Sequence, residues 1–167
     1  MYEILIVGGG PAGLTAAIYA ARAGKHVAVL ERGSTGGQII SAPLVENYPG
    51  IPSVSGTELA RQMTEQACTF GAEIVYTEAV GLEKIPAGFR VLCTDGVREA
   101  KTVILATGAA HRSLGLAAED ALTGCGVSYC AVCDGAFYEG LDVAVVGGGD
   151  TAVQDALLLA NTCRSVT

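Results

Sequence analysis

The stretch "YEILIVGGGPAGLTAAIYAARAGKHVAVLE", residues 2–31, decides the expected architecture. Residues 3–7 form a continuous apolar run, which is typical of a parallel strand buried on both faces. A Gly-rich turn follows, and the Ala-rich residues 12–23 predict a helix. Residues 26–30 predict a second buried strand that ends at Glu31. Strand, turn, helix and strand in this order predict a βαβ unit.

The glycines of this turn have the spacing of a dinucleotide-binding fingerprint. Gly8, Gly10 and Gly13 form G-x-G-x-x-G between the predicted strand and helix. Without side chains they permit a tight turn, the approach of a pyrophosphate and close helix packing, and the helix then presents free N–H groups to the phosphate. Glu31 ends the next strand, where a carboxylate can accept hydrogen bonds from ribose hydroxyls. The alternative interpretation is a tight turn beside a surface glutamate.

The next part of the chain predicts a loop and a helix. Residues 32–55 are rich in Gly, Ser and Pro and show no sustained periodicity, so we expect a long ordered loop that contains a short helix. Loops of this length in compact domains are commonly functional. A helix is predicted to start near Ser55 or Thr57 and to run to Phe70 before Gly71 ends it.

A small antiparallel meander is predicted after a strand at residues 73–77. Residues 80–85, 89–94 and 97–101 are short segments separated by the turn signals "PAG" and "DG". Residues 102–106 predict a further buried strand, which a turn follows.

The opening pattern then returns near Leu141. "LDVAVVGGGDTAVQDALLLA" combines an apolar strand, three glycines and an Ala/Leu-rich helix. The predicted fold is therefore α/β with two Rossmann-like dinucleotide-binding domains in the three-layer FAD/NAD(P)-binding arrangement. We expect the first at residues 1–112, with the meander, and the start of the second at residues 113–167, both incomplete in this chain.

Gly147, Gly149 and Ala152 form the second fingerprint, with Ala as an accepted variant in the last position. Asp150 and Asp155 then fall in or near the first turns of the helix, where the macrodipole favours negative charge. The residue that distinguishes NADH from NADPH is expected about twenty positions after the first glycine, where this chain ends. The choice between the two stays open.

Cys130 and Cys133 form a C-x-x-C motif followed by Asp134. Such a pair can form a disulfide reversibly, and the thiolate is favoured when the first sulfur lies at a helix start or beside a cation. Asp134 is a candidate proton donor and acceptor, or a helix cap. Inert buried thiols and tetrahedral zinc are the alternatives, but zinc needs four ligands, and His26 and His111 are isolated from each other. Beside two dinucleotide folds, the dithiol predicts an electron path from nicotinamide through flavin to the disulfide and then to an outside substrate.

Composition excludes some functions. The chain has 167 residues, a net charge of −7 and only 10 Lys and Arg, which argues against a nucleic-acid surface. No apolar run approaches the ~18 residues of a membrane span. The start at Met1 without a basic leader, and the wide spacing of the remaining cysteines, predict a cytoplasmic protein in a reducing compartment.

Six strings across the chain resemble the low-molecular-weight, bacterial-type thioredoxin reductases in order and spacing. They are "GGGPAG" at 8–13, "GGQ" at 36–38, "ENYPG" at 46–50, "ATGA" at 106–109, "GVSYCAVCDG" at 126–135 and "VVGGGDTA" at 145–152. The C-x-x-C-D-G element within the second domain is specific to this family and to relatives such as the flavoprotein partner of alkyl hydroperoxide reductase.

The resemblance implies an NADPH-dependent disulfide reductase with FAD and NADPH as cofactors, NADH not being excluded, thioredoxin or a thioredoxin-like protein as partner, and a homodimer. It implies that Cys133 faces the flavin, that Cys130 attacks thioredoxin and that Asp134 is the acid. The FAD contacts that it implies are Gly8, Gly10, Pro11, Ala12, Gly13, Glu31, Arg32, Gly36, Gly37, Gln38, Asn47, Thr107 and Gly108. The nicotinamide-cofactor contacts that it implies are Gly147, Gly149, Asp150 and Thr151, and it implies no metal.

The chain departs from the family in two respects. "GLAAED" at 115–120 lacks the proline usual there, and family members are nearly twice as long. We therefore expect either a fragment of a longer product or a truncated chain that turns over slowly or not at all. The alternatives within and outside the enzyme class are the reductase of a peroxiredoxin system, a non-catalytic FAD-binding fragment and a zinc-binding domain.

Overall fold

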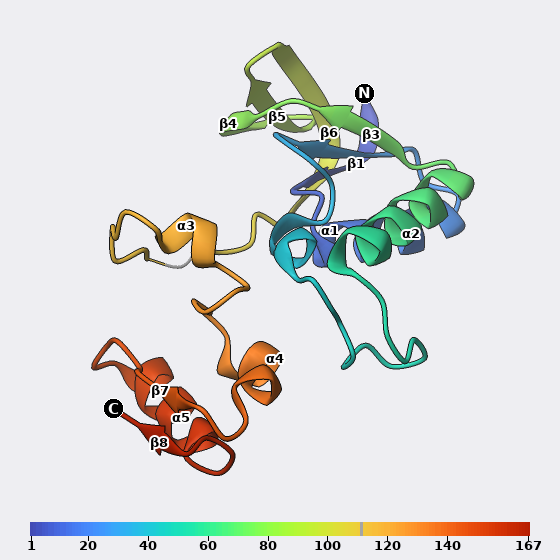
Figure 1. Cartoon of the computed structure of the whole chain (residues 1–167). Coiled ribbons are helices and arrows are strands. Elements are labelled where there is room, and N and C mark those ends of the chain that lie inside the picture. The colour runs from blue at the N-terminus through green and yellow to red at the C-terminus, as the bar shows by residue number, and fades with distance from the viewer. Residues whose placement is uncertain (111) are drawn as a thin grey trace. The chain divides into compact units, whose positions relative to one another are not determined.

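The computed structural model describes residues 1–110 and 112–167, which form two compact units (Figure 1). The first unit contains Met1–Glu46 and Ser53–Ala110. The second contains Asn47–Pro52 and the described residues that follow Ala110. His111 lies outside the described residues.

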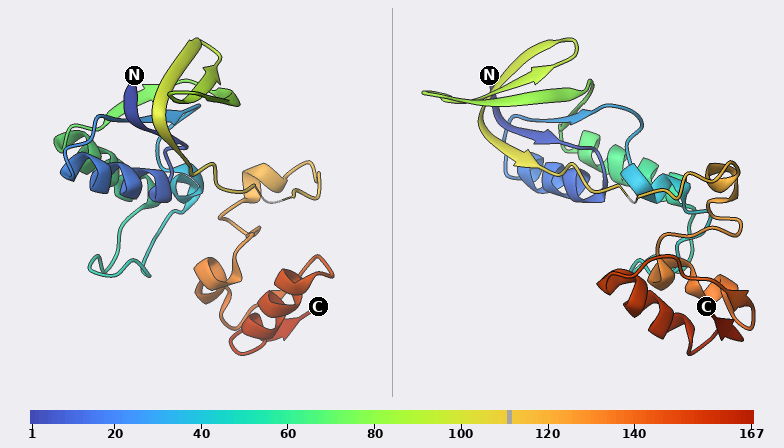
Figure 2. Two further views of the ribbon diagram at one scale, coloured as in Figure 1. Left: turned by 180° about the vertical axis from the view of Figure 1, so that it is seen from behind. Right: turned by 90° about the vertical axis from the view of Figure 1, so that its left-hand side faces the viewer.

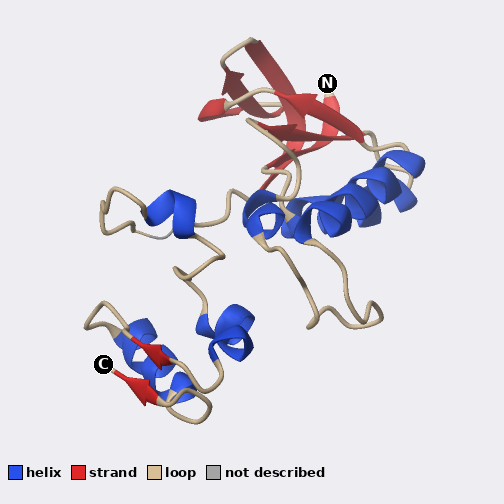
Figure 3. Ribbon diagram, in the orientation of Figure 1, coloured by secondary structure: helices blue, strands red, loops and turns tan. Residues whose placement is uncertain are grey.

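A single sheet organises the first unit (Figure 3). Its order is β3-β2-β1-β6-β5-β4, with parallel pairs β2·β3, β1·β2 and β1·β6 and antiparallel pairs β4·β5 and β5·β6. The strands are β1 (Tyr2–Val7), β2 (Val27–Glu31), β3 (Glu73–Tyr76), β4 (Ala79–Ile85), β5 (Gly88–Cys93) and β6 (Gly96–Leu105). The predicted parallel βαβ start and antiparallel meander are both confirmed.

The structure corrects the prediction of separate strands at 97–101 and 102–106. One strand, β6, covers both segments, and Ala100 pairs with Phe89 of the meander and with Tyr2 of β1. No Gly or Pro interrupts the chain between these segments, so the strand continues from one partner to the other. The prediction that the second segment is buried is also wrong at the carboxyl end of β6, where Leu105 is 65% exposed.

Two helices lie on the same face of this sheet (Figure 2). They are α1 (Pro11–Arg22) and α2 (Gly56–Thr69), and they also contact each other. Ser55 caps α2 by accepting a hydrogen bond from the Glu58 N–H at 3.2 Å, as the sequence predicted. Consecutive residues Leu5 and Ile6 are both fully buried, which confirms that β1 is covered on both faces.

The segment between β2 and α2 is the predicted long ordered loop. It contains a short helical turn, η1 (Gly37–Ser41), and an isolated bridge between Val45 and Val54. The two backbone hydrogen bonds of this bridge, at 2.7 and 3.1 Å, close the far part of the loop. The loop therefore has defined structure over most of its length.

The second unit repeats the strand, glycine turn, helix and strand order. It contains α3 (Glu119–Leu122), α4 (Ala131–Asp134), η2 (Gly135–Tyr138), β7 (Asp142–Val143), α5 (Asp150–Leu159) and β8 (Ser165–Val166). β7 pairs in parallel with β8, and backbone hydrogen bonds extend this pairing to Val145 and Thr167. Within the described part of the chain, no helix is long and apolar enough to cross a membrane.

We predict that Gly13→Ala destabilises the first unit, whereas Gly10→Ala does not. A Cβ at Gly13 would lie 1.9 Å from the Gly8 carbonyl oxygen, whereas the nearest atom to a Cβ at Gly10 is 3.9 Å away. Overpacking of a tight contact typically costs about 1–3 kcal/mol. Urea unfolding of the flavin-free protein measures both variants. Equal unfolding midpoints for Gly13→Ala and the parent protein would show that the close approach of Gly13 to the Gly8 carbonyl does not limit stability.

Candidate functional site

The first candidate site lies where β1, β2 and β6 end. Gly8 follows β1 with φ +107°, a conformation that favours glycine, and a Cβ there would lie 2.2 Å from the Ala106 carbonyl oxygen. The Ala106 N–H in turn donates to the Val7 carbonyl at 2.8 Å. The turn after β1 and the turn after β6 are therefore in backbone contact.

Glu31 lies beside the glycine turn at the end of β2. Its Oε2 accepts a hydrogen bond from the Gly9 N–H, and its Oε1 accepts one from the Gly33 N–H, each at 2.8 Å. These two bonds fix the carboxylate, and each oxygen keeps a further acceptor position. Arg32 is exposed, with Nη1 at 3.9 Å from Glu78 Oε1.

The loop after β2 approaches the same turn. The Gly36 N–H donates to the Gly9 carbonyl at 2.7 Å, and a Cβ at Gly37 would lie 3.4 Å from the Gly10 Cα. Gln38 Nε2 donates to the Ala109 carbonyl, in the turn after β6. The structure thus brings together three predicted segments that are separate in sequence, namely Gly8–Gly13, Gly36–Gln38 and Thr107–Gly108. Gly108 has φ +68°.

The residues of this site fit a dinucleotide. Among the described residues, no side chain caps the amino end of α1, and its first turn contains no acidic residue. Pro11 begins the helix and Ala12 is exposed, so the free N–H groups of this turn meet no competing anion. A Cβ at Gly10 would lie 3.9 Å from the Gly37 Cα, and one at Gly37 would lie 3.4 Å from the Gly10 Cα, so larger side chains at either position would crowd the start of α1. The free donors at the start of α1 suit a pyrophosphate.

Asn47 belongs to the second unit, which includes Asn47–Pro52, and its role at the flavin stays a prediction.

The second glycine turn precedes α5. Gly147 has φ +144°, and a Cβ there would lie 3.0 Å from the Ala152 Cβ, which explains why a small residue occupies the third fingerprint position. Gly149 is the N-cap of α5 and, among the described residues, no side chain caps this helix. Asp150 and Thr151 occupy its exposed first turn, as predicted for Asp150. The turn is open around Gly149.

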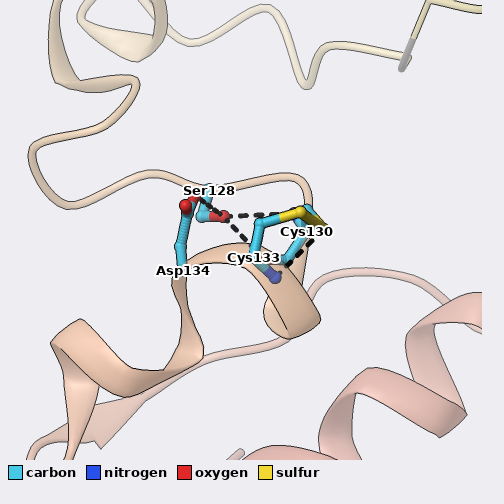
Figure 4. The surroundings of a disulfide bond; sticks show 4 residues. All are labelled: Ser128, Cys130, Cys133 and Asp134. Carbon is cyan, nitrogen blue, oxygen red and sulfur yellow. Dashed lines mark hydrogen bonds between the residues drawn. A yellow bond between two sulfur atoms is a disulfide. The ribbon is translucent and has the colours of Figure 1, made fainter. Parts of the chain in front are cut away.

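Cys130 and Cys133 form a disulfide at the start of α4, with 5.3 Å between their Cα atoms (Figure 4). Cys130 is the N-cap of this short helix, and its Sγ accepts a hydrogen bond from the Cys133 N–H at 3.2 Å. The first sulfur therefore lies at a helix start, one of the two settings in which a thiolate is favoured. A Cβ at Gly135 would lie 3.3 Å from Leu159 Cδ2, so the segment after the disulfide packs directly on α5.

Asp134 is connected to the disulfide turn by Ser128, which sequence reasoning missed. Ser128 Oγ accepts from the Cys130 N–H at 3.1 Å and donates to Asp134 Oδ2 at 2.6 Å (Figure 4). A serine hydroxyl can accept from one neighbour while it donates to another. The serine two positions before the first cysteine was the available signal, because Ser commonly bonds nearby backbone.

Within the described part of the chain, no group of three or more His, Cys, Asp or Glu side chains is placed to hold a metal ion. His26 belongs to the first unit, where its Nε2 lies 3.2 Å from Glu73 Oε1. His111, the other histidine of the zinc alternative, is outside the described residues.

Relatives of known sequence match over the whole chain but only part of their own length. A thioredoxin reductase of Listeria monocytogenes is 44% identical over 167 residues, which are 100% of this chain and 52% of that protein. A thioredoxin reductase of Bacillus subtilis is 44% identical over 169 residues, and the match covers 100% of this chain and 53% of that protein. The chain thus spans about half the length of the curated relatives it matches.

Solved structures agree with the fold. The thioredoxin reductase of Streptococcus pyogenes MGAS5005 superposes with a TM-score of 0.95 at 49% identity, over 99% of this chain and 54% of that one. The thioredoxin reductase of Giardia duodenalis gives 0.93 at 36% identity over the same shares. The sequence pattern of pyridine nucleotide-disulphide oxidoreductases matches residues 2–167. With its two glycine turns and its C-x-x-C disulfide, this chain belongs to the pyridine nucleotide-disulphide oxidoreductase family.

Proposed function

We propose that this chain is the FAD- and dithiol-bearing part of a thioredoxin reductase, which passes electrons from NADPH through FAD and the Cys130–Cys133 disulfide to thioredoxin. The observation that carries the proposal is the disulfide itself, formed at a helix start and packed on the second dinucleotide turn-helix unit. The printed names of the relatives support thioredoxin as the acceptor. A cytoplasmic homodimer is part of the same proposal.

In this proposal residues 1–112 hold FAD, and residues 113–167 begin the NADPH domain. The N–H groups of the α1 first turn would hold the pyrophosphate, and Glu31 would accept hydrogen bonds from the ribose hydroxyls. Gln38 and the turn at 107–108, which Gln38 reaches through the Ala109 carbonyl, would complete the site. When bound, FAD supplies a two-electron carrier that can take a hydride from a nicotinamide and reduce a disulfide. Gly147, Gly149, Asp150 and Thr151 form the phosphate turn for NADPH.

The chemistry of the chain's own residues is thiol–disulfide exchange. Two electrons and two protons convert the Cys130–Cys133 disulfide into two thiols. The Cys130 thiolate attacks the thioredoxin disulfide, forming a mixed disulfide and releasing one thioredoxin thiolate, which takes up a proton. The Cys133 thiolate then attacks the Cys130 sulfur, restores the intramolecular disulfide and releases the second thioredoxin sulfur. No further oxidant or reductant is needed for this exchange.

Asp134 supplies and removes the protons of these steps. A departing sulfur leaves more easily when a proton reaches it, and a thiol becomes a nucleophile when a proton leaves it. Ser128 holds the Asp134 carboxylate by donating to Oδ2, and it is itself held by the Cys130 N–H. The acid therefore keeps a fixed orientation relative to the turn that carries both sulfurs.

Gly10→Val is expected to remove flavin while the fold is retained. The added side chain crowds the free N–H groups at the start of α1, where the pyrophosphate is proposed to bind, and FAD affinity should fall at least about tenfold, or about 1.4 kcal/mol. Ala23→Val, at the exposed end of α1, adds a similar side chain away from the site. Flavin absorbance per purified chain measures retention. Equal flavin in Gly10→Val and Ala23→Val would place the cofactor elsewhere.

The order of the sulfurs is tested in the flavin-loaded protein that carries this chain. With Cys130→Ser, the remaining Cys133 thiolate should give a long-wavelength charge-transfer band with the oxidised flavin, and Cys133→Ser should abolish it. Cys68→Ser, which changes an exposed thiol on α2, is the control and should leave the spectrum unchanged. A band that survives Cys133→Ser and disappears with Cys130→Ser would reverse the proposed roles.

A further inference from the structure

Glu119 occupies an unusual position in the second unit. Among the described residues it alone is both charged and buried, with 4% of its surface exposed. A buried carboxylate is strongly disfavoured unless hydrogen-bond donors surround it. The hydrogen-bond donors around the Glu119 carboxylate therefore identify the segments that it connects.

Three successive backbone N–H groups converge on this carboxylate. The Leu114 N–H donates to Oε1 at 2.8 Å, and those of Gly115 and Leu116 donate to Oε2 at 2.7 and 3.1 Å. Gly115 has φ +76°, a left-handed conformation that turns consecutive N–H groups toward one point. The three amides fix the carboxylate relative to the segment 114–116.

The fourth donor is the hydroxyl of Tyr129, which bonds to Glu119 Oε1. Tyr129 is the residue directly before Cys130, and on its other side Ser128 is bonded to Asp134. The segment 128–130 is therefore bonded to Asp134 through Ser128 and to Glu119 through Tyr129. The thiol–disulfide exchange itself does not use the contact with Glu119.

Glu119 stays ionised and Tyr129 stays protonated over the pH range in which thiols react, so the hydrogen bond between them does not change with pH there. The Tyr129 hydroxyl and the backbone amides lower the pKa of Glu119 to about 2, and the hydrogen bond to Glu119 raises the pKa of Tyr129 to about 12. The stabilisation from the carboxylate is present above its ordinary pKa and is lost as the pH falls through about 2. The stabilisation from the Tyr129 hydroxyl is present below pH 10, its ordinary pKa, and is lost as the pH rises through about 12.

We propose that Glu119 and Tyr129 are positioning residues for the redox pair. Glu119, fixed by the amides of residues 114–116, holds Tyr129 and thereby keeps Cys130 where its sulfur meets the Cys133 N–H. In the reduced protein the same N–H favours the Cys130 thiolate, which is the attacking species. The inference rests on the proposed function only in treating this thiolate as the nucleophile.

Alkylation of the reduced protein that carries this chain tests the inference. After chemical reduction, iodoacetamide is added at several pH values and the modification of each cysteine is followed by mass spectrometry. Tyr129→Phe and Glu119→Gln should slow alkylation of Cys130 near pH 7 by about threefold or more, because the thiolate fraction falls. Exposed Cys68 on α2 is the internal reference, and its rate should not change.

Two matched controls separate the contact from general effects of substitution. Asp120→Asn removes a neighbouring charge that is exposed on the same short helix, and Tyr19→Phe removes an exposed hydroxyl on α1. Both should react like the parent protein. The Glu119→Gln, Tyr129→Phe double variant should slow Cys130 by less than the two single effects combined, because the two side chains share the contact between Glu119 and Tyr129.

Amide hydrogen exchange distinguishes the two ends of the contact. Glu119→Gln should lose protection at Leu114, Gly115 and Leu116, whereas Tyr129→Phe should keep it. An unchanged Cys130 alkylation profile in Tyr129→Phe would overturn the inference, and this variant decides the matter even where Glu119→Gln does not fold. If the parent protein fails to reduce thioredoxin with NADPH, the proposed function is wrong, while the alkylation result still judges the contact.

Discussion

At the carboxyl end of β1 two stretches of backbone come so close that no side chain fits between them. A Cβ on Gly13 would overlap the Gly8 carbonyl, and one on Gly8 would overlap the Ala106 carbonyl. The first contact sets α1 against β1, and the second sets the end of β6 beside the turn. The amino end of α1, Glu31 and the loop at 36–38 then surround one small volume. The proposed FAD site depends on these approaches more than on any side chain.

The second unit contains a glycine turn of the same kind, followed by α5. Its glycine turn is more open, with room around Gly149, and α5 supports the disulfide segment through the contact of Gly135 with Leu159. Around the sulfurs, the order comes from polar contacts of neighbouring residues. Ser128 joins the Cys130 amide to Asp134, and Tyr129 joins the same segment to Glu119. These contacts hold the disulfide segment in place even though Cys133 and the neighbouring Val132 are exposed.

Local sequence signals predicted most elements of the fold, because each signal acts over a few residues. The apolar run of β1, the cap at Ser55 and the fingerprint glycines specify their own geometry. The continuity of β6 was not predictable in this way, since it depends on pairing with β1, which is far away in sequence. The contact between Glu119 and Tyr129 spans fewer residues, but it requires that α3 and the disulfide segment fold against each other. The C-x-x-C pair was predictable, whereas its hydrogen-bonded surroundings were not.

In the proposed reaction, electrons from NADPH reach the Cys130–Cys133 disulfide through bound flavin. This step is measured most directly by differential thiol labelling under anaerobic conditions, in the protein that carries this chain, with and without NADPH and with and without bound FAD. We expect new thiols at Cys130 and Cys133 only when both NADPH and FAD are present, and equal labelling of Cys68 in all samples. Bleaching of the flavin by NADPH while both cysteines stay in the disulfide would contradict the proposal.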